Sequence, residues 1–270
     1  MPLLHLILVA ILQGITEFLP ISSSGHLILL PNLFGLPDQG QVIDVAVHVG
    51  TLGAVMLYYR QDVAQALIGL GQLTKGRFEA AEARFVTLLI IATIPVVIAG
   101  LLFKITGLDD RLRSVQVIAW TMIIFGVVLW WADRVGRDVK QTDDWTIKDA
   151  LIMGLWQVLA LIPGTSRSGI TITGGRFLGY AREDAIRLAM LMSIPTIIAS
   201  GALLGIEVAA TMDGALARDS GIAAIFAFVA AYAALHVMVM MARSISFTPY
   251  VIYRLALGGF LLAYFGLSTT

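Results

Sequence analysis

The chain has 270 residues, of which 58% are hydrophobic and 13% are charged, and its mean hydropathy is +0.87. Soluble domains carry roughly 25% charged residues, so this composition excludes an ordinary soluble protein and indicates an integral membrane protein. A net charge of zero gives no support to nucleic-acid binding, and the lack of cysteine excludes disulfides and thiolate chemistry.

The first apolar segment, residues 3–34, is interrupted by a polar run at Pro20. Before the break, Gln13 and Glu17 lie four residues apart, so a helix presents them on one face. Proline ends the hydrogen bonding of that helix, and a second half-helix begins near His26, with N–H groups that favour anions. Polar groups at membrane depth are costly and therefore indicate a functional site. The candidates here are Gln13, Glu17, Ser22, Ser23, Ser24, Gly25 and His26.

The second broken segment covers residues 149–178 and is interrupted between Pro163 and Gly169. Arg167 is always charged, and its planar fork matches a phosphate bidentately. It is also the natural partner of Glu17, which leaves open the alternative that the two only lock the segments together. The candidates in this run are Gly164, Ser166, Arg167, Ser168, Gly169 and Thr171.

Each broken segment is too long for one membrane span and too short for two, so we expect two re-entrant helix–loop–helix hairpins. Simple spans of about 20 apolar residues complete an all-α membrane protein. The six predicted spans are 42–60, 85–103, 115–132, 185–206, 222–241 and 250–267.

This arrangement places four connections, 60–84, 133–148, 176–187 and 242–254, on one face, and they hold thirteen of the 18 basic residues. The positive-inside rule puts that face in the cytoplasm and both termini outside. One hairpin and three spans then occur twice, at about 1–135 and about 147–270. Because three is odd, the second repeat is inverted, and the hairpin tips can meet near the midplane.

The two polar runs resemble the motifs of the BacA/UppP family of undecaprenyl-diphosphate phosphatases. The first motif, Gln-x-x-x-Glu followed by Pro-x-Ser-Ser-x-Gly-His, is matched from Gln13 to His26. The second, Pro-Gly-x-Ser-Arg-Ser-Gly-x-Thr, is matched from Pro163 to Thr171. Many members have Glu in place of Gln13, so a metal site of paired carboxylates is weakened here.

The resemblance implies hydrolysis of undecaprenyl diphosphate to undecaprenyl phosphate in the bacterial inner membrane, which recycles the lipid carrier of cell-wall synthesis. It also implies bacitracin resistance on overproduction and a divalent cation, Mg²⁺ or Ca²⁺, held by Glu17 with Gln13. The oligomeric state is open, with a homodimer as one candidate.

For the reaction, Ser23 is the preferred nucleophile, activated by His26, while Glu17 orients His26 or holds Mg²⁺ and Arg167 binds phosphate. His26 as the direct nucleophile stays open. The rival reading is a polyprenyl-phosphate transporter or flippase, because inverted repeats with paired broken helices are a transporter architecture.

Overall fold

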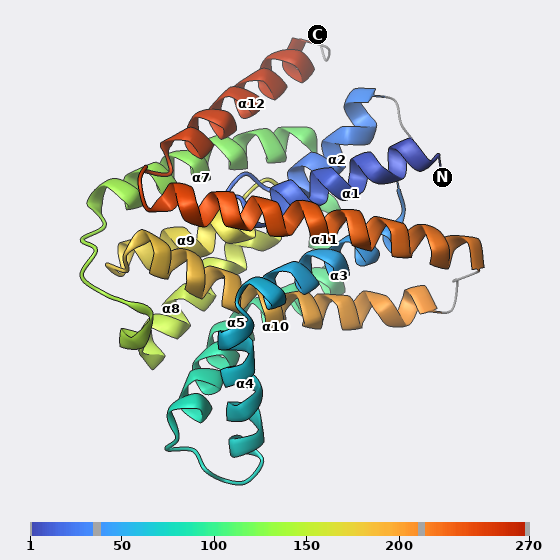
Figure 1. The fold of residues 1–270 in the computed structure, drawn as a ribbon. Helices are drawn as coiled ribbons and strands as arrows, with labels where there is room; N and C mark the ends of the chain where they lie inside the picture. The colour runs from blue at the N-terminus through green and yellow to red at the C-terminus, as the bar shows by residue number, and fades with distance from the viewer. Residues whose placement is uncertain (1, 35–38, 210–213, 268–270) are drawn as a thin grey trace.

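In a computed structural model that describes residues 2–34, 39–209 and 214–267, the chain is all-α (Figure 1). The first half contains α1 (Leu3–Phe18), α2 (Ser23–Phe34), α3 (Gln41–Tyr58), α4 (Arg60–Leu73), α5 (Ala81–Thr106), α6 (Leu108–Leu112) and α7 (Val115–Val135). The second contains η1 (Thr142–Asp144), α8 (Ile147–Val158), η2 (Leu159–Leu161), α9 (Arg167–Phe177), α10 (Arg182–Ala209), α11 (Gly214–Ala242) and α12 (Thr248–Leu267).

Within the described residues, six helices are long and apolar enough to cross a membrane, namely α3, α5, α7, α10, α11 and α12. They correspond one to one with the six predicted spans, which makes the chain a multi-pass membrane protein. The largest difference is at the start of α11, which begins at Gly214 rather than at 222. The helix extends beyond its apolar core there, because small and charged residues still permit helical backbone.

Both interrupted segments have the predicted helix–loop–helix form. In Figure 1, α1 and α2 approach from one end of the molecule and α8 and α9 from the other, so that the two tips meet centrally. The Ser168 hydroxyl of the second tip donates to the Leu19 carbonyl of the first at 3.0 Å. The arrangement is compatible with re-entrant hairpins and with an inverted repeat, both of which stay predictions.

The helix packing is reciprocal between the two halves. The first hairpin packs through α1 on α11, and the second packs through α8 on α5. Both contacts are close because a glycine faces a backbone carbonyl. A Cβ on Gly14 would lie 2.6 Å from the Ala227 oxygen, and one on Gly154 would lie 2.5 Å from the Ala92 oxygen. Small residues at such crossings let helices associate in lipid, where no hydrophobic force drives them together.

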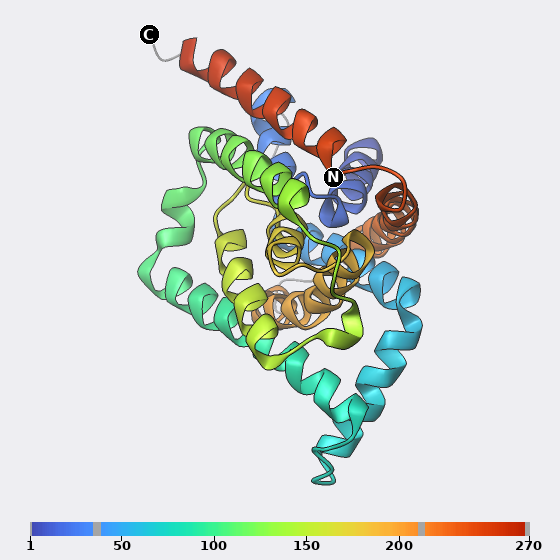
Figure 2. The same cartoon turned by 90° about the vertical axis from the view of Figure 1, so that its left-hand side faces the viewer.

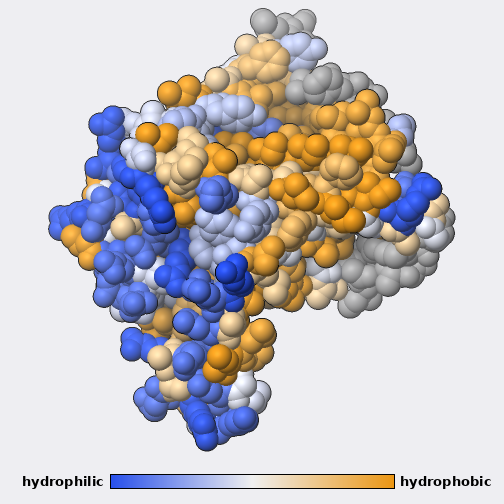
Figure 3. Space-filling model, viewed as in Figure 1, coloured by the Kyte–Doolittle hydropathy of each residue, from blue (hydrophilic) through white to orange (hydrophobic). Residues whose placement is uncertain are grey.

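The surface has a polar end and an apolar band. Hydrophilic residues gather at the left and bottom of Figure 3, over the connections that precede α5, α8, α10 and α12, and hydrophobic residues cover the middle and right. The predicted cytoplasmic connections therefore share one end of the molecule. Residues 60–73, taken as part of a connection in the sequence, form the helix α4.

Two of the thirteen basic residues counted on those connections, Arg176 and Arg254, are buried inside the protein rather than exposed at its polar end. Arg176 lies in α9 and pairs with Asp133 at 3.3 Å and with Asp138. Arg254 lies in α12 and is fully buried. Of the other eleven, five lie on the connections and six lie near the ends of the adjoining helices, so the charge bias persists. The whole stretch Ser168 to Arg176 of α9 is buried, and the yellow hairpin in Figure 2 lies within the surrounding helices.

Candidate active site

A single carboxylate joins the two hairpins. Glu17 lies in the last turn of α1 and is 7% exposed. Its Oε1 accepts a hydrogen bond from Arg167 Nη2 at 2.6 Å, which is the predicted pairing across the two hairpins. Its Oε2 accepts from the Ser23 hydroxyl at 2.6 Å and from Gln13 Nε2 at 2.7 Å. A buried carboxylate needs such partners, and here they come from both broken segments.

The backbone turns in the same way at both tips. Ser22 precedes α2 with φ of 76°, and Ser166 precedes α9 with φ of 72°. Each serine caps its helix, since the Ser22 hydroxyl accepts from Gly25 N at 3.3 Å and the Ser166 hydroxyl accepts from Gly169 N at 3.2 Å. Positive φ is costly for a residue with a Cβ and is typical of functional sites. The result is a helix N-terminus at each of two tips that contact one another through the Ser168–Leu19 bond.

Ser23 and Arg167 occupy equivalent positions, because each is the first residue of the helix that follows its capping serine. Both side chains turn back to Glu17. A hydroxyl with a carboxylate as proton acceptor and a guanidinium are thereby placed beside two helix N-termini. This arrangement suits a phosphate group and a nucleophile that attacks it.

His26 does not form a hydrogen bond with Ser23 in the described structure. Its Nδ1 lies 2.6 Å from the Ser22 carbonyl oxygen, and its Nε2 lies 2.6 Å from the hydroxyl of Tyr253. The proposed activation of Ser23 by His26 therefore stays a prediction without a contact to support it. His48 of α3 has its Nε2 3.8 Å from Glu17 Oε2.

The sequence reasoning missed Arg254, which holds both tips by their carbonyl groups. Its Nη1 donates to the Pro20 oxygen at 3.3 Å, and its Nη2 donates to the oxygens of Gly164 at 3.2 Å and Thr165 at 2.9 Å. It also bonds carbonyls of α7. The signal was present, since Tyr253 and Arg254 interrupt an apolar stretch, but Arg254 was counted at the end of a connection.

The other predicted residues build the tips. Ser24 is exposed and lies 3.3 Å from the Ser22 hydroxyl, while buried Ser168 lies 3.1 Å from that of Ser166. Thr171 is fully buried and donates to the Arg167 carbonyl. Gly25, Gly164 and Gly169 lie where the two tips and their neighbours approach closely. At Gly164, whose φ is +86°, a Cβ would meet Thr121 at 2.2 Å.

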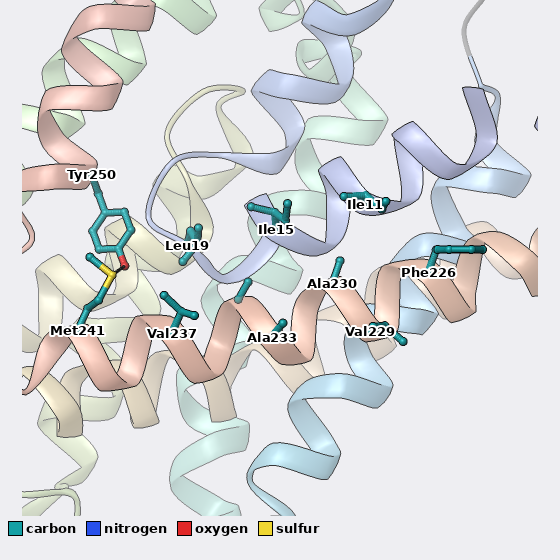
Figure 4. A pocket seen from close by; sticks show the side chains of 11 residues that line it. Ile11, Ile15, Leu19, Phe226, Val229, Ala230, Ala233, Val237, Met241 and Tyr250 are labelled. Carbon is teal, nitrogen blue, oxygen red and sulfur yellow. Dashed lines mark hydrogen bonds between the residues drawn. The ribbon is translucent and has the colours of Figure 1, made fainter. Parts of the chain in front are cut away.

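Two cavities adjoin the hairpins and differ in character. A polar cavity of about 260 Å³ lies beside the tips and is lined by Ser24, Leu27, Ile28, Gln39, Asp44, His48, Arg113, Leu161 and Pro163. An apolar groove of about 550 Å³ lies between α1 and α11 (Figure 4). Its wall includes Ile11 and Ile15, which lie on the opposite face of α1 from Gln13 and Glu17. The polar cavity is lined by His48, whose Nε2 lies 3.8 Å from Glu17 Oε2.

Two polar atoms at this site are buried and unpartnered among the described residues, namely Gln13 Oε1 and Arg167 Nη1. The same residues contain no group of three or more His, Asp, Glu or Cys side chains arranged for a metal ion. The Glu17 carboxylate and the side-chain amide oxygen of Gln13 are nevertheless ligand types that suit an ion such as Mg²⁺. This ion takes few protein oxygens and completes its shell with phosphate and water.

Comparison with known proteins finds one family model, described as bacitracin resistance protein BacA, that matches residues 6–260. The chain is 65% identical to an undecaprenyl-diphosphatase of Ruegeria pomeroyi over 97% of this chain and 98% of the relative. It is 63% identical to one of Dinoroseobacter shibae with the same coverage. A more distant undecaprenyl-diphosphatase, of Teredinibacter turnerae, is 48% identical over 96% of this chain and 97% of the relative.

Proposed function

The chain belongs to the BacA family, and we propose that it hydrolyses undecaprenyl diphosphate to undecaprenyl phosphate and phosphate. One observation carries the assignment to specific residues. The Ser23 hydroxyl and the Arg167 guanidinium meet on the two oxygens of Glu17, beside the N-termini of α2 and α9. This reaction recycles the lipid carrier of cell-wall synthesis in the bacterial inner membrane, and it accounts for the bacitracin resistance in the family's description.

In the first step, Ser23 Oγ attacks the terminal phosphorus, and the bond from that phosphorus to the bridging oxygen breaks. The Ser23 proton passes to Glu17 Oε2, 2.6 Å away, and from there to the leaving undecaprenyl phosphate. Glu17 takes the role of base because it is the group that the hydroxyl contacts. Arg167 binds the phosphate oxygens through Nη1, which is unpartnered, while Nη2 stays on Glu17.

In the second step, water attacks the phosphoserine and gives its proton to Glu17. The proton returns to Ser23 Oγ as the phosphorus–serine bond breaks and phosphate leaves. The free N–H groups in the first turns of α2 and α9 stabilise the charge on the phosphoryl oxygens in both steps.

We propose that the Glu17 carboxylate and the side-chain amide oxygen of Gln13 (Oε1) hold a divalent cation, Mg²⁺ or Ca²⁺, together with the diphosphate. The cation would neutralise negative charge on the phosphate oxygens. The unpartnered, fully buried Gln13 Oε1 supports this position.

A transporter of polyprenyl phosphate is not favoured. Transport needs an anion cradle, but it has no use for a serine hydroxyl bonded to a buried carboxylate. We place both termini outside, since the basic connections lie at the other end of the molecule. Arg113, which belongs to the same face as the termini, lines the polar cavity. We infer that the diphosphate head enters through this cavity. A homodimer stays a prediction.

The test is phosphate release from C55 diphosphate by the purified protein, with and without a chelator. Wild type should turn over, and Ser23→Ala should lose about 10³-fold or more, since loss of an activated nucleophile disables the reaction. Ser200→Ala, the same change in α10 where the hydroxyl bonds the Ile197 carbonyl, is the control. Wild-type protein that binds the lipid without releasing phosphate would contradict the proposal.

A further inference from the structure

The hydrogen bonds of His26 give it a role that the proposed chemistry does not use. A carbonyl oxygen only accepts, so the 2.6 Å contact with Ser22 requires the proton of the ring on Nδ1. In the neutral ring Nε2 is then an acceptor, and the hydroxyl of Tyr253 donates to it at 2.6 Å. The two rings lie nearly parallel, with centroids 5.7 Å apart. Both nitrogens are therefore engaged away from Ser23.

The carbonyl that His26 holds belongs to the strained turn. Ser22 has positive φ and directly precedes Ser23, so the orientation of its peptide sets where the Ser23 side chain begins. An anchored Ser22 carbonyl thus fixes the direction of the hydroxyl toward Glu17. The neighbouring residue of Tyr253, Arg254, holds the Pro20 carbonyl on the other side of the same turn. Two successive residues of α12 therefore brace the first tip.

Building on the proposed function, we propose that His26 and Tyr253 are positioning residues. They form a chain from α12 through the imidazole to the Ser22 carbonyl, which holds Ser23 on Glu17. His26 is then neither the proton acceptor nor the nucleophile. The role needs a hydrogen-bond donor at the place of Nδ1 and does not need a basic nitrogen.

Three variants of His26 distinguish a positioning residue from a general base. The amide nitrogen of His26→Asn can reproduce the Nδ1–H donor, whereas His26→Gln reaches toward Nε2 and His26→Ala supplies neither. We expect kcat of His26→Asn to stay within about tenfold of wild type. Alanine and glutamine should lose about 10- to 100-fold, because the Ser22 carbonyl then loses its short side-chain bond and keeps only the 3.3 Å bond from the backbone N–H of residue 26. His26→Asn no more active than His26→Ala would overturn the proposal, as would an acid-labile, base-stable phosphoryl adduct on His26.

Tyr253→Phe keeps the stacked ring and removes only the hydroxyl, so it should lower kcat by about 3- to 10-fold, as loss of one hydrogen bond does, with KM unchanged. A spectroscopic measurement works even without turnover. With ¹⁵N-labelled histidine, of which the chain has four, wild type should show the Nδ1-protonated ring at His26, assigned by the signal missing in His26→Asn. Tyr253→Phe should shift the Nε2 resonance, and an unshifted resonance would overturn the chain of contacts.

The activity and spectroscopic measurements can also contradict this inference and the proposed function independently of each other. Wild-type protein without phosphate release contradicts the hydrolase, and the nitrogen resonances still decide the role of Tyr253. An active wild type together with an inactive His26→Asn contradicts only the positioning role of His26. Gel filtration and thermal melting establish that each variant is folded.

Discussion

The two hairpin tips have nearly the same backbone and carry opposite chemistry. Each has a capping serine with positive φ, then a long or reactive side chain, a second serine and a glycine. The sequence runs Ser22-Ser23-Ser24-Gly25 at the first tip and Ser166-Arg167-Ser168-Gly169 at the second. In the proposed reaction, the shared backbone provides two helix N-termini suited to an anion, and the difference at one position provides a nucleophile at one tip and a permanent cation at the other.

The tips also differ in what holds them. In the second, α9 is enclosed, with Ser168 to Arg176 all buried. In the first, Ser24 is exposed, and the Ser22 carbonyl accepts a hydrogen bond from the His26 side chain, while Arg254 bonds carbonyls of both tips. In the proposed reaction, the enclosed second hairpin supplies the binding charge of Arg167, and the first hairpin supplies the reacting groups Ser23 and Glu17. Variants at matched positions can break or sharpen this comparison.

The largest effect is expected where the two tips meet. Glu17→Gln removes the proton acceptor of Ser23 and leaves the Arg167 charge without its buried partner. Phosphate release should fall by about 10³-fold, within the range of general-base contributions. The double variant with Ser23→Ala should be little worse than either single change, because the two act as a unit. Additive losses in the double variant would mean that Glu17 acts apart from Ser23.

Arg167→Lys should follow, with a loss of about 10²-fold. It keeps the charge and removes the planar fork that serves Glu17 and phosphate together. The matched control is Arg218→Lys in α11, whose side chain is exposed and pairs with the adjacent Asp219. Near-normal turnover of Arg167→Lys would mean that the second tip contributes charge alone.

How far the sequence predicts this site depends on whether helical spacing or opposite charge identifies the partner of each residue. Gln13 and Glu17 could be paired from helical spacing, and Arg167 could be paired with Glu17 because a buried acid needs a cation. The bonds of His26 could not be predicted, since Tyr253 is 227 positions away and the tip geometry depends on positive φ at a serine. Arg254 was missed because a guanidinium that binds carbonyls has no acidic partner to reveal it.

The capping serines should give a smaller effect, on stability. Ser166→Ala loses the bond to Gly169 N and keeps an unfavourable φ, at a cost of about 1 kcal/mol for the cap. Ser166→Gly loses the same bond and relieves the strain, so it should be more stable than Ser166→Ala by about 1 kcal/mol. Ser22→Ala and Ser22→Gly should show the same order. Thermal melting in detergent measures the pairs, and alanine variants more stable than glycine variants would contradict the positive φ.

The smallest effect on turnover is expected at Gln13. Gln13→Glu adds a carboxylate beside Glu17, which pairs with the Arg167 guanidinium. The added charge repels the diphosphate unless a divalent cation neutralises it, so activity with saturating Mg²⁺ should stay within about tenfold of wild type, while a chelator should remove more of it. The control is Gln157→Glu. Like Gln13, Gln157 is fully buried, lies in the first helix of its hairpin and has an unpartnered Oε1 among the described residues. Its Nε2 donates to the Thr196 hydroxyl at 3.2 Å, whereas Gln13 Nε2 donates to the Glu17 carboxylate. The carboxylate that Gln157→Glu introduces should lower the melting temperature without changing chelator sensitivity. Equal chelator sensitivity in Gln13→Glu and wild type would remove Gln13 from the cation site and leave Glu17 as its only side-chain ligand.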